Sequence, residues 1–278
     1  MEEETMKNIK KIMITLVLTA AVVISLSGCT MRVSVNYDNA DKYTPGDREI
    51  TETIRNLDID YSEGNVSVVS GNSDIVFVKE TTNKKIEDKL KVHTWVEGDT
   101  LHVKYCAAAK NLSFNNLQKS LEITVPEKAK LDDVVIDASE GDVDVSCSAK
   151  DYNIDASEGN VNLTQNGESN SMVIDASEGN VKVDAQKVKE FEVDASEGNC
   201  ELRFAEAPAK TSVDASEGDV TLYLPDNSDI TAELNISEGD FNSELPFIKK
   251  GDKYICGNGT NKMMIDASEG NVNVKKYN

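Results

Sequence analysis

A ten-residue phrase recurs along this chain, with the approximate form Ile-Asp-Ala-Ser-Glu-Gly-Asn-Val-x-Val. Counted from its Asp position, successive copies are 18, 20, 19, 20 and 21 residues apart. Self-similarity at a near-fixed period of about 20 residues is typical of solenoids, in which each repeat buries its apolar face only against its neighbours. The chain is therefore predicted to be a stack of similar rungs. The near-intact copies lie at 136–145, 154–163, 174–183, 193–202, 213–222 and 265–274, with degenerate copies at 59–68 and near 235–241.

Within one repeat, apolar and polar residues alternate on both sides of a Ser-Glu-Gly-Asn segment. Ile154 and Ala156 point to one side before this segment, and Val161 and Leu163 point to the same side after it. A period of two predicts strands with one buried face. Gly at the third position of the connecting segment predicts a type II turn, which requires a positive φ there. The glycines predicted to be structural turn residues are Gly141, Gly159, Gly179, Gly198, Gly218 and Gly270.

Short strands that recur with the same residues on successive turns favour parallel stacking. The predicted fold class is all-β, a right-handed parallel β-helix or solenoid with rungs of about 20 residues. A β-propeller is the main rival, but its four-stranded blades need about 40 residues each. A sandwich of hairpins is the third option, and it would not require such close repetition.

The predicted domain organisation has three parts. Residues 1–28 are expected to be a lipoprotein signal peptide, and the polar segment 29–54 a membrane-proximal tether. Residues 55–278 are expected to form one β-helical domain, with less regular rungs in 55–130 and regular repeats in 131–278.

The N-terminus has the features of an export signal. Three lysines precede an apolar run at 12–26, which ends in Leu26-Ser27-Gly28-Cys29 and matches a bacterial lipobox. A single transmembrane anchor is the alternative, but the run is shorter than the ~20 apolar residues that a span needs. We expect Cys29 to carry lipid and to hold the protein at the membrane. The predicted location is the outer face of the bacterial cytoplasmic membrane, or the outer membrane if the source has one.

Charge and cysteine spacing exclude several classes of function. The chain has 50 acidic and 29 basic residues, for a net charge of −21, which argues against binding to nucleic acid or to anionic lipid through protein charge. Four cysteines remain after Cys29, with spacings of 41, 53 and 56 residues that match neither redox nor zinc motifs. The sequence leaves undecided whether they form disulfides after export. These residues are Cys106, Cys147, Cys200 and Cys256.

In-register rungs would place the acidic residues of the repeat in columns. Equivalent residues would lie about 4.8 Å apart, and like charges at that spacing repel by roughly 1 kcal/mol in water. Two explanations are open. Divalent cations, with Ca²⁺ as the expected ion, could bind the columns, or turn N–H groups could donate to each Asp while salt screens the Glu side chains. No other cofactor is predicted. The candidate cation ligands are Asp137, Asp155, Asp175, Asp194, Asp214, Glu140, Glu158, Glu178, Glu197 and Glu217.

Several segments outside the clear repeats carry a family resemblance. They are the early copy at 59–66, Gly98-Asp99-Thr100-Leu101, and 121–126 running into the repeats. Through them, residues 55–278 resemble the bacterial "putative adhesin" family of β-strand-repeat proteins of unknown function. The resemblance implies an extracytoplasmic β-helix at the cell envelope, and the family offers no catalytic motif to transfer.

The residues argue against an enzyme. Basic residues are scarce in the repeat, and no nucleophile arrangement, phosphate loop or zinc spacing surrounds His93 and His102. The predicted function is a non-enzymatic, lipid-anchored envelope protein that serves as an adhesin-like binding or structural module. Its expected partner, besides the membrane, is a protein or a surface polymer. The alternatives are an accessory in envelope-stress sensing or signalling, or a Ca²⁺-stabilised surface scaffold.

Overall fold

The computed structural model describes residues 32–277, so the predicted signal peptide and the lipidation of Cys29 lie outside the described residues. Almost all regular structure in this range is β, with two short 3₁₀ turns, η1 (Ala40–Lys42) and η2 (Asp88–Leu90). The all-β prediction is confirmed. Over 32–277 there is no helix long and apolar enough to cross a bilayer.

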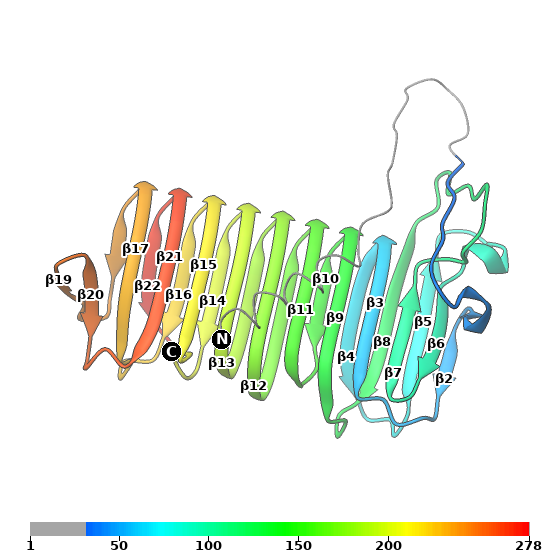
Figure 1. Ribbon diagram of the computed structural model, residues 1–278, viewed down its shortest axis with the longest axis horizontal. Coiled ribbons are helices and arrows are strands. Elements are labelled where there is room, and N and C mark those ends of the chain that lie inside the picture. Colours follow the sequence, from blue (N-terminus) through cyan, green and yellow to red (C-terminus); the bar gives the residue numbers. More distant parts are fainter. Residues whose placement is uncertain (1–31, 278) are drawn as a thin grey trace, which may run out of the picture.

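The strands form a rod with two long walls (Figure 1). In each rung the chain ascends one wall, bends at a glycine and descends the other wall, and two long strands turn the lower corner to begin the next rung. The ascending wall contains, in spatial order, β7 (Thr100–Lys104), β3 (Asn56–Glu63), β9 (Leu131–Glu140), β11 (Ala149–Glu158), the second halves of β12 (Val161–Glu178) and β13 (Val181–Glu197), β15 (Lys210–Glu217), β21 (Asn261–Glu269) and β17 (Ile230–Glu238). The descending wall contains β8 (Lys119–Pro126), β4 (Asn65–Gly71), β10 (Val143–Ser146), the first halves of β12 and β13, β14 (Cys200–Phe204), β16 (Val220–Leu224), β22 (Val272–Lys276) and β18 (Phe241–Ser243).

Neighbouring rungs pair in parallel, and equivalent residues of the repeat face each other. Asp155 pairs with Asp137 on one side and with Asp175 on the other. The core lies between the two walls, where Ile154, Val161 and their counterparts are fully buried. The alternation of the sequence therefore sets which side of each strand faces inward, and the predicted parallel solenoid is confirmed.

The spatial order of the rungs departs from the sequence order at the C-terminal end. The last repeat, β21–β22, lies between β15–β16 and β17–β18 rather than outside them. The chain builds the outermost rung first, then makes a hairpin of β19 (Ile248–Lys250) and β20 (Lys253–Cys256), and then returns inward. This path accounts for the 31-residue step between the copies at Asn235 and Asp266.

The N-terminal end is reordered in the same way. The first repeat, β3–β4, lies second in the stack, between β7–β8 and β9–β10. Two antiparallel strands close this end, with β5 (Val76–Thr82) against β8 and β6 (His93–Glu97) against β7. The first and the last sequence repeats are thus both internal rungs.

The described part of 29–54, predicted to be a membrane-proximal tether, pairs with the N-terminal end of the rod. β1 (Thr44–Pro45) pairs with β6, and β2 (Arg48–Ile50) pairs with β5. Although the segment is mostly polar, a few of its residues attach it to the end of the rod. Ile50 and Ile54 are buried in the core, and the Tyr43 ring packs edge-on against Trp95 at a centroid distance of 5.7 Å.

Candidate functional site

The upper edge of the rod, where every rung bends, is the most regular surface of the molecule. Its glycines have φ between +105° and +134°, and each also meets the backbone of the next rung. A Cβ on Gly159 would lie 2.3 Å from the carbonyl oxygen of Gly141, and one on Gly198 would lie 2.2 Å from that of Gly179. Glycine is thus required for its backbone conformation and for the close approach of rungs, and the second reason was not predicted. The column comprises Gly64, Gly141, Gly159, Gly179, Gly198, Gly218, Gly270 and Gly239.

The amides of the bend bond to neighbouring rungs, whereas the predicted type II turn would bond across the bend. Gly141 N–H donates to the carbonyl oxygen of Glu158 at 2.8 Å. The backbone N–H of Asn180 donates to Oδ1 of Asn160 at 3.1 Å, and its side-chain amide donates to the same oxygen at 3.0 Å. The same pattern repeats along the edge and forms an unbroken Asx ladder. Its members are Asn65, Asp142, Asn160, Asn180, Asn199, Asp219, Asn271 and Asp240.

The aspartates of the repeat also align, in what we call the Asp column. Lys104 Nζ lies 3.0 Å from Asp60 Oδ2 at one end, and the amide of Asn235 donates to Asp266 Oδ2 at 3.1 Å at the other. Between these ends, no residue of 32–277 donates a hydrogen bond to the carboxylates. The explanation in which turn amides satisfy each Asp therefore does not hold here, because those amides donate to the Asx ladder and to backbone carbonyls of neighbouring rungs. The column comprises Asp60, Asp137, Asp155, Asp175, Asp194, Asp214 and Asp266.

The environment of the five middle members of the Asp column favours protonation. Burial, together with the neighbouring charges of Asp60 and Asp155, raises the pKa of Asp137 to about 6. Burial is also the main cause of the raised pKa of Asp155 and of Asp175. The pKa values of Asp194 and Asp214 are also raised, and in both cases the charges of adjacent column members add to the effect of burial. These five aspartates therefore hold protons more tightly than isolated aspartates do.

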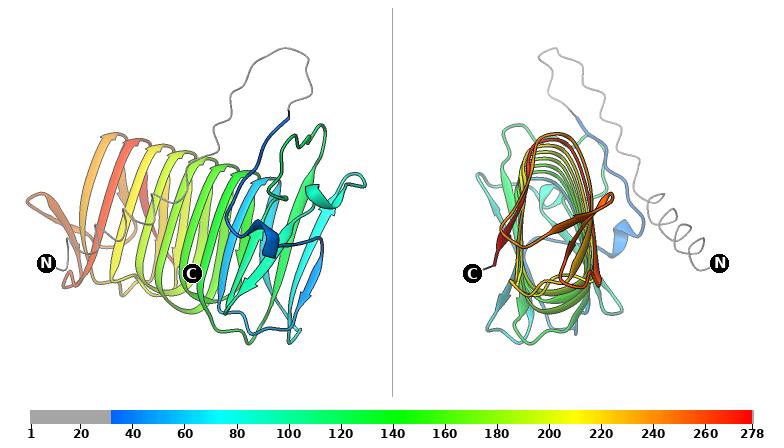
Figure 2. Two further views of the ribbon diagram at one scale, coloured as in Figure 1. Left: turned by 45° about the vertical axis from the view of Figure 1, so that its right-hand side comes forward. Right: turned by 90° about the vertical axis from the view of Figure 1, so that its left-hand side faces the viewer.

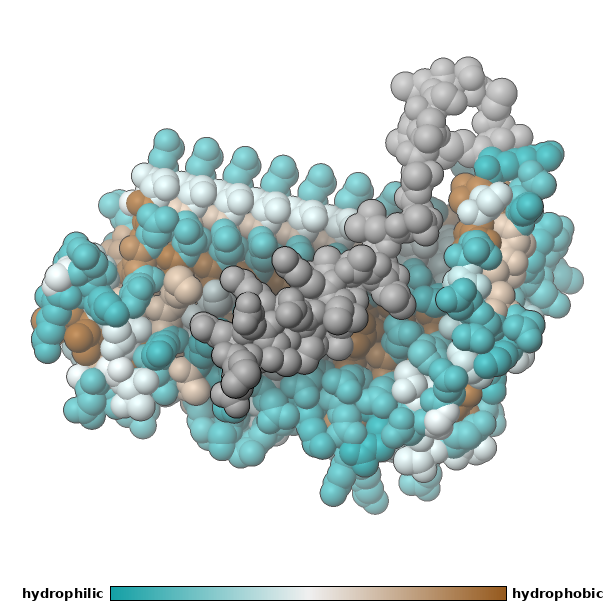
Figure 3. Space-filling model, viewed as in Figure 1, coloured by the Kyte–Doolittle hydropathy of each residue, from teal (hydrophilic) through white to brown (hydrophobic). Residues whose placement is uncertain are grey.

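A second acidic column follows the outer side of the bend, and we call it the Glu column. Its side chains are mostly exposed, and Figure 3 shows a row of hydrophilic side chains that protrude from the upper edge over β17 and its neighbours. The column comprises Glu63, Glu140, Glu158, Glu178, Glu197, Glu217, Glu269 and Glu238.

These acids form linear arrays and not a chelating cluster. Within the described chain, no three His, Cys, Asp or Glu side chains come together in a way that could hold a metal ion. Any ion at the edge would have to bridge successive rungs of a column. The four described cysteines are all free and buried in the core, so they add no ligand. The arrangement can concentrate counter-ions and present evenly spaced carboxylates to a long partner.

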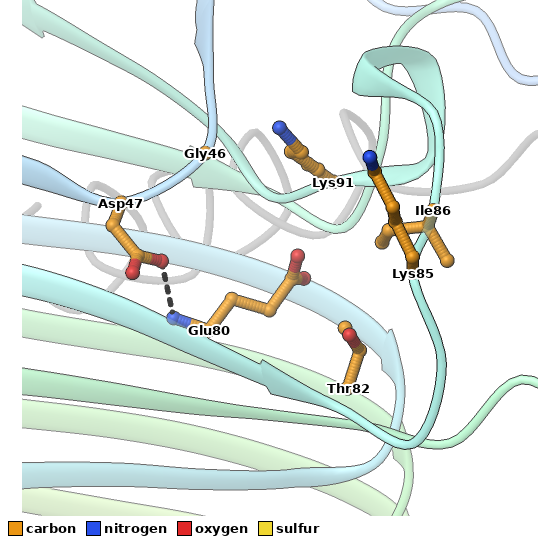
Figure 4. A pocket seen from close by; sticks show the side chains of 7 residues that line it. All are labelled: Gly46, Asp47, Glu80, Thr82, Lys85, Ile86 and Lys91. Atoms are coloured by element: carbon orange, nitrogen blue, oxygen red, sulfur yellow. Dashed lines mark hydrogen bonds between the residues drawn. The ribbon is translucent and has the colours of Figure 1, made fainter.

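An open hollow of about 430 Å³ lies apart from this edge, at the N-terminal end (Figure 4). Asp47 accepts a hydrogen bond there from the backbone N–H of Glu80, at 2.8 Å. The Glu80 carboxylate is itself fully engaged, since it lies 2.7 Å from Lys119 Nζ, accepts from Tyr61 OH at 3.1 Å and accepts from Val92 N–H at 3.0 Å. The carboxylate therefore serves to close the core and offers no free acid to a substrate.

The surroundings of the two histidines do not form a catalytic arrangement. His102 Nδ1 lies 2.6 Å from Asp58 Oδ2, and its ring stacks on Trp95 at 5.3 Å. His93 is buried, and burial lowers its pKa. Neither ring has a Ser or Cys nucleophile bonded to it in residues 32–277.

Comparison with known proteins places the whole rod in one family. The sequence model described as Toastrack DUF4097 matches residues 54–166 and 147–275, which together include nearly every rung. The chain belongs to this family. The paired matches fit a Toastrack domain made of equivalent rungs, since either half of the stack satisfies the same pattern. No curated protein matches the chain significantly in sequence.

Several solved structures resemble this Toastrack protein weakly. A "putative cell adhesion protein" from Clostridium sporogenes is 17% identical, covering 84% of this chain and 99% of that chain, with a TM-score of 0.37. A "putative adhesin" from Bacteroides fragilis is 14% identical, covering 82% and 95%, with a TM-score of 0.40. A "putative lipid binding protein" from Parabacteroides distasonis is 14% identical, covering 84% and 97%, with a TM-score of 0.40. Likenesses of this degree assign no function to the chain.

Proposed function

We propose that this protein is a non-catalytic, lipid-anchored module of the bacterial cell envelope that binds a partner along its acidic upper edge. The observation that carries the proposal is the pair of in-register acidic columns, Asp and Glu, which run along the bends of the rungs. Evenly spaced identical carboxylates suit a long partner that repeats a positive group, such as a protein segment or a surface polymer. They do not surround a small substrate.

The shape of the rod supports binding rather than catalysis. The Asx ladder and the glycine column fix the spacing of the bends, so the edge cannot close around a ligand as an enzyme cleft does. A rigid array of charges binds a matching array without a large ordering cost, because its geometry is already set. The edge is therefore suited to multivalent contact, in which many weak ion pairs add up.

The proposed anchor would attach at the N-terminal end of the rod. Cys29 lies three residues before Arg32, the first described residue, a distance that extended chain spans in about 10 Å. Residues 44–50 pair with β5 and β6, which close this end. A lipid on Cys29 would thus hold the N-terminal end near the membrane and leave the rest of the edge accessible.

Fatty-acid labelling tests the anchor. The full chain, expressed in bacteria fed an alkyne fatty acid, is expected to take up label and to partition into detergent. A Cys29→Ser variant should lose both properties, whereas a Cys200→Ser variant should keep them, because Cys200 is buried in the core. Label that persists in Cys29→Ser would contradict the proposed anchor.

Binding to cell envelopes tests the acidic edge. Purified protein from residue 30 onward is mixed with envelopes of the source bacterium, and the bound fraction is measured. The triple variant Glu158→Gln, Glu178→Gln and Glu197→Gln is expected to bind roughly tenfold more weakly. The control variant Glu201→Gln, Glu206→Gln and Asp226→Asn removes three charges from the other side of the rod and should bind like the wild type. Equal loss in both variants would show general charge attraction and not edge recognition.

A Ca²⁺-stabilised scaffold is the second candidate role, favoured by the missing hydrogen-bond donors in the middle of the Asp column. Cations that bridge successive rungs would offset the repulsion between carboxylates. The role in envelope-stress sensing or signalling stays a prediction.

A further inference from the structure

The C-terminal end of the rod is only half covered. β20 pairs with the outermost ascending strand, β17, over Ile230–Glu233 alone. The rest of β17 and the whole of β18 have a strand neighbour only on their inner side. The end-on view in Figure 2 shows the β19–β20 hairpin crossing this end while the bend above it stays open. We call the uncovered stretch from Leu234 to Phe241 the notch.

The notch exposes groups that every inner rung buries. Leu234, Ile236 and Phe241 are only half-buried, whereas their counterparts in the adjoining rung, such as Ile265 and Val272, are buried. A hollow of about 320 Å³ lies among them, next to Lys249 and Tyr254 of the hairpin.

The backbone of the notch is also incomplete. In an inner rung the bend glycine donates to the following rung, as Gly218 N–H does to the carbonyl of Glu269 at 2.9 Å. The amides of Gly239 and Phe241 have no such acceptor among residues 32–277. Gly239 is accordingly the one exposed member of the glycine column. The notch is therefore an unfinished rung edge, with half-exposed apolar side chains, of which Phe241 packs on Phe247 and Tyr254 of its own chain, and with two backbone donors that have no acceptor in residues 32–277.

The adjacent hairpin has the opposite character. Ile248 is 63% exposed, and Lys249 and Lys250 beside it are exposed and form no ion pair within the described chain. These positive charges stand on a molecule with a net charge of −21. The notch carries the acids Glu238 and Asp240. One end of the rod thus presents a projection that carries Ile248 and two lysines, beside an apolar recess that holds Glu238 and Asp240 and is also lined by Lys249 and Asp252 of the hairpin.

We infer that two copies of this protein dock C-terminal end to C-terminal end about a twofold axis, with the β19–β20 hairpin of each copy in the notch of the other. A twofold axis brings the same two surfaces together reciprocally, and here those surfaces match in shape and charge. Ile248 would lie against Leu234, Ile236 and Phe241. Lys249 and Lys250 would lie near Glu238 and Asp240.

Other occupants fit the end less well. A head-to-tail copy would need an open N-terminal end, but β5 and β6 close that end, and its outermost pairs are the short β1, which contains Pro45, and β2. Short edges and proline block the addition of further strands. The three-residue β19, with two lysines, is a similarly blunted edge for a foreign strand. The docking is therefore closed and stops at two copies.

Charge reversal in pairs tests this dimer. Sedimentation velocity of the chain from residue 30 onward, at about 100 µM, is expected to give a dimer. The hairpin variant Lys249→Glu, Lys250→Glu and the notch variant Glu238→Lys, Asp240→Lys should each be monomeric at that concentration. A mixture of the two variants should form a heterodimer, because the negative hairpin then meets a positive notch and the positive hairpin meets a negative one.

A matched control and an uncharged variant complete the test. Lys128→Glu, Lys130→Glu reverses two exposed lysines near the other end and should remain dimeric. Ile248→Ser changes an exposed side chain, so the fold is kept, and should weaken the dimer by roughly tenfold. A monomeric wild type, species larger than a dimer, or a mixture that stays monomeric would each overturn the inference. None of these outcomes affects the proposed binding at the acidic edge.

Discussion

The two ends of the rod are closed by different means. At the N-terminal end, Lys119 stands beside Gly64, where the next member of the glycine column would be, and its side chain turns into the core. Its ammonium group is held by Glu80 at 2.7 Å, by the carbonyl of Leu90 at 2.7 Å and by that of Tyr105 at 2.5 Å. At the C-terminal end, no comparable group among residues 32–277 covers the bend at Gly239. A repeat that stacks well on itself therefore needs a separate device at each end.

The ends also differ in how they fill the inward corner before the bend. Six rungs have alanine there, and the position holds Tyr61 near the N-terminal end and Ile236 at the C-terminal end. The Tyr61 ring packs on Tyr105 at 5.0 Å and is fully buried, whereas Ile236 remains half-buried. The N-terminal end is thus a finished boundary, and the C-terminal end is a boundary that a partner can complete.

The largest expected effect concerns the middle of the rod, which both ends protect. Gly198→Ala places a Cβ 2.2 Å from the carbonyl oxygen of Gly179 and at a φ of +118°. The clash with backbone and the strained φ should lower the free energy of unfolding by about 3 to 5 kcal/mol. Gly251→Ala in the C-terminal hairpin also has a positive φ but meets no atom within 4 Å, so it should cost about 1 kcal/mol. Urea unfolding of both variants measures the difference, and equal losses would contradict the role of close rung approach.

The next largest effect on stability is expected from Lys119, which closes the N-terminal end of the rod. Lys119→Met removes the partner of a buried carboxylate and should cost about 3 kcal/mol, because Glu80 is left charged and unpaired. The double variant Lys119→Met, Glu80→Gln should recover part of this loss. A matched variant at the C-terminal end is Tyr254→Ala, which truncates a half-buried ring. It should lower the free energy of unfolding by only about 1 kcal/mol. Losses as large at the open end would mean that both ends are equally closed.

A smaller effect is expected in the Asp column, toward its N-terminal end. The folded pKa of Asp137 is about 6, against an ordinary value of 3.8. The folded protein thus holds this proton more tightly than the unfolded chain does, so stability falls as the pH rises from about 4 to 6 and stays lower above 6. Asp137→Asn should therefore raise stability by roughly 1 kcal/mol at pH 8, a value discounted for partial exposure, and by almost nothing at pH 4.

Chemical denaturation of Asp137→Asn and the wild type at both pH values tests this sign. The difference between the two proteins removes the contribution of His93, whose lowered pKa acts in the opposite direction. A stabilisation that is the same at pH 4 and pH 8 would show that the effect is not the charge of Asp137.

Calcium gives the smallest expected effect. If cations bridge the columns, a thermal melt of residues 30–278 in millimolar Ca²⁺ should lie a few degrees above that in EDTA, for a gain of about 1 kcal/mol. Mg²⁺ and NaCl at matched ionic strength serve as controls. A rise that NaCl reproduces would identify screening, and the columns would then be held by the Asx ladder and core alone.

Much of the fold can be predicted from the sequence, because the residues of a single repeat determine its strands, its bend and its buried face. Alternating Ile154 and Ala156, followed by a glycine and then Val161, predict the wall, the bend and the second wall of each rung. The order of rungs at the ends does not follow, since one repeat pairs with any other equally well. Only the long step between Asn235 and Asp266 hints at the return of the chain.

The acidic edge was predicted only in part, because the repeat period determines which residues align but not which hydrogen bonds form between rungs. The alignment of Asp155 with Asp175 is a direct result of the period, so the columns could be predicted from spacing. The Asx ladder was missed because Asn160 suits a local turn, and its bonds to Asp142 and Asn180 exist only between rungs. The strands in 44–50 were missed because a few buried residues, such as Ile50, decide the structure of an otherwise polar segment.

The inward placement of the first repeat determines how the rod would bear a mechanical load. A pull transmitted through residues 32–54 first loads the short β1–β6 and β2–β5 pairings, and once these are lost it reaches β3, which is bonded to β7 on one side and to β9 on the other. To extract β3, the force must shear both parallel ladders together, whereas an outermost strand would detach after losing one. In a protein held by its N-terminus, the main barrier to unfolding under force therefore lies at the second rung, behind two short antiparallel pairings, and the rate at which both ladders of β3 break together sets how long the rod resists.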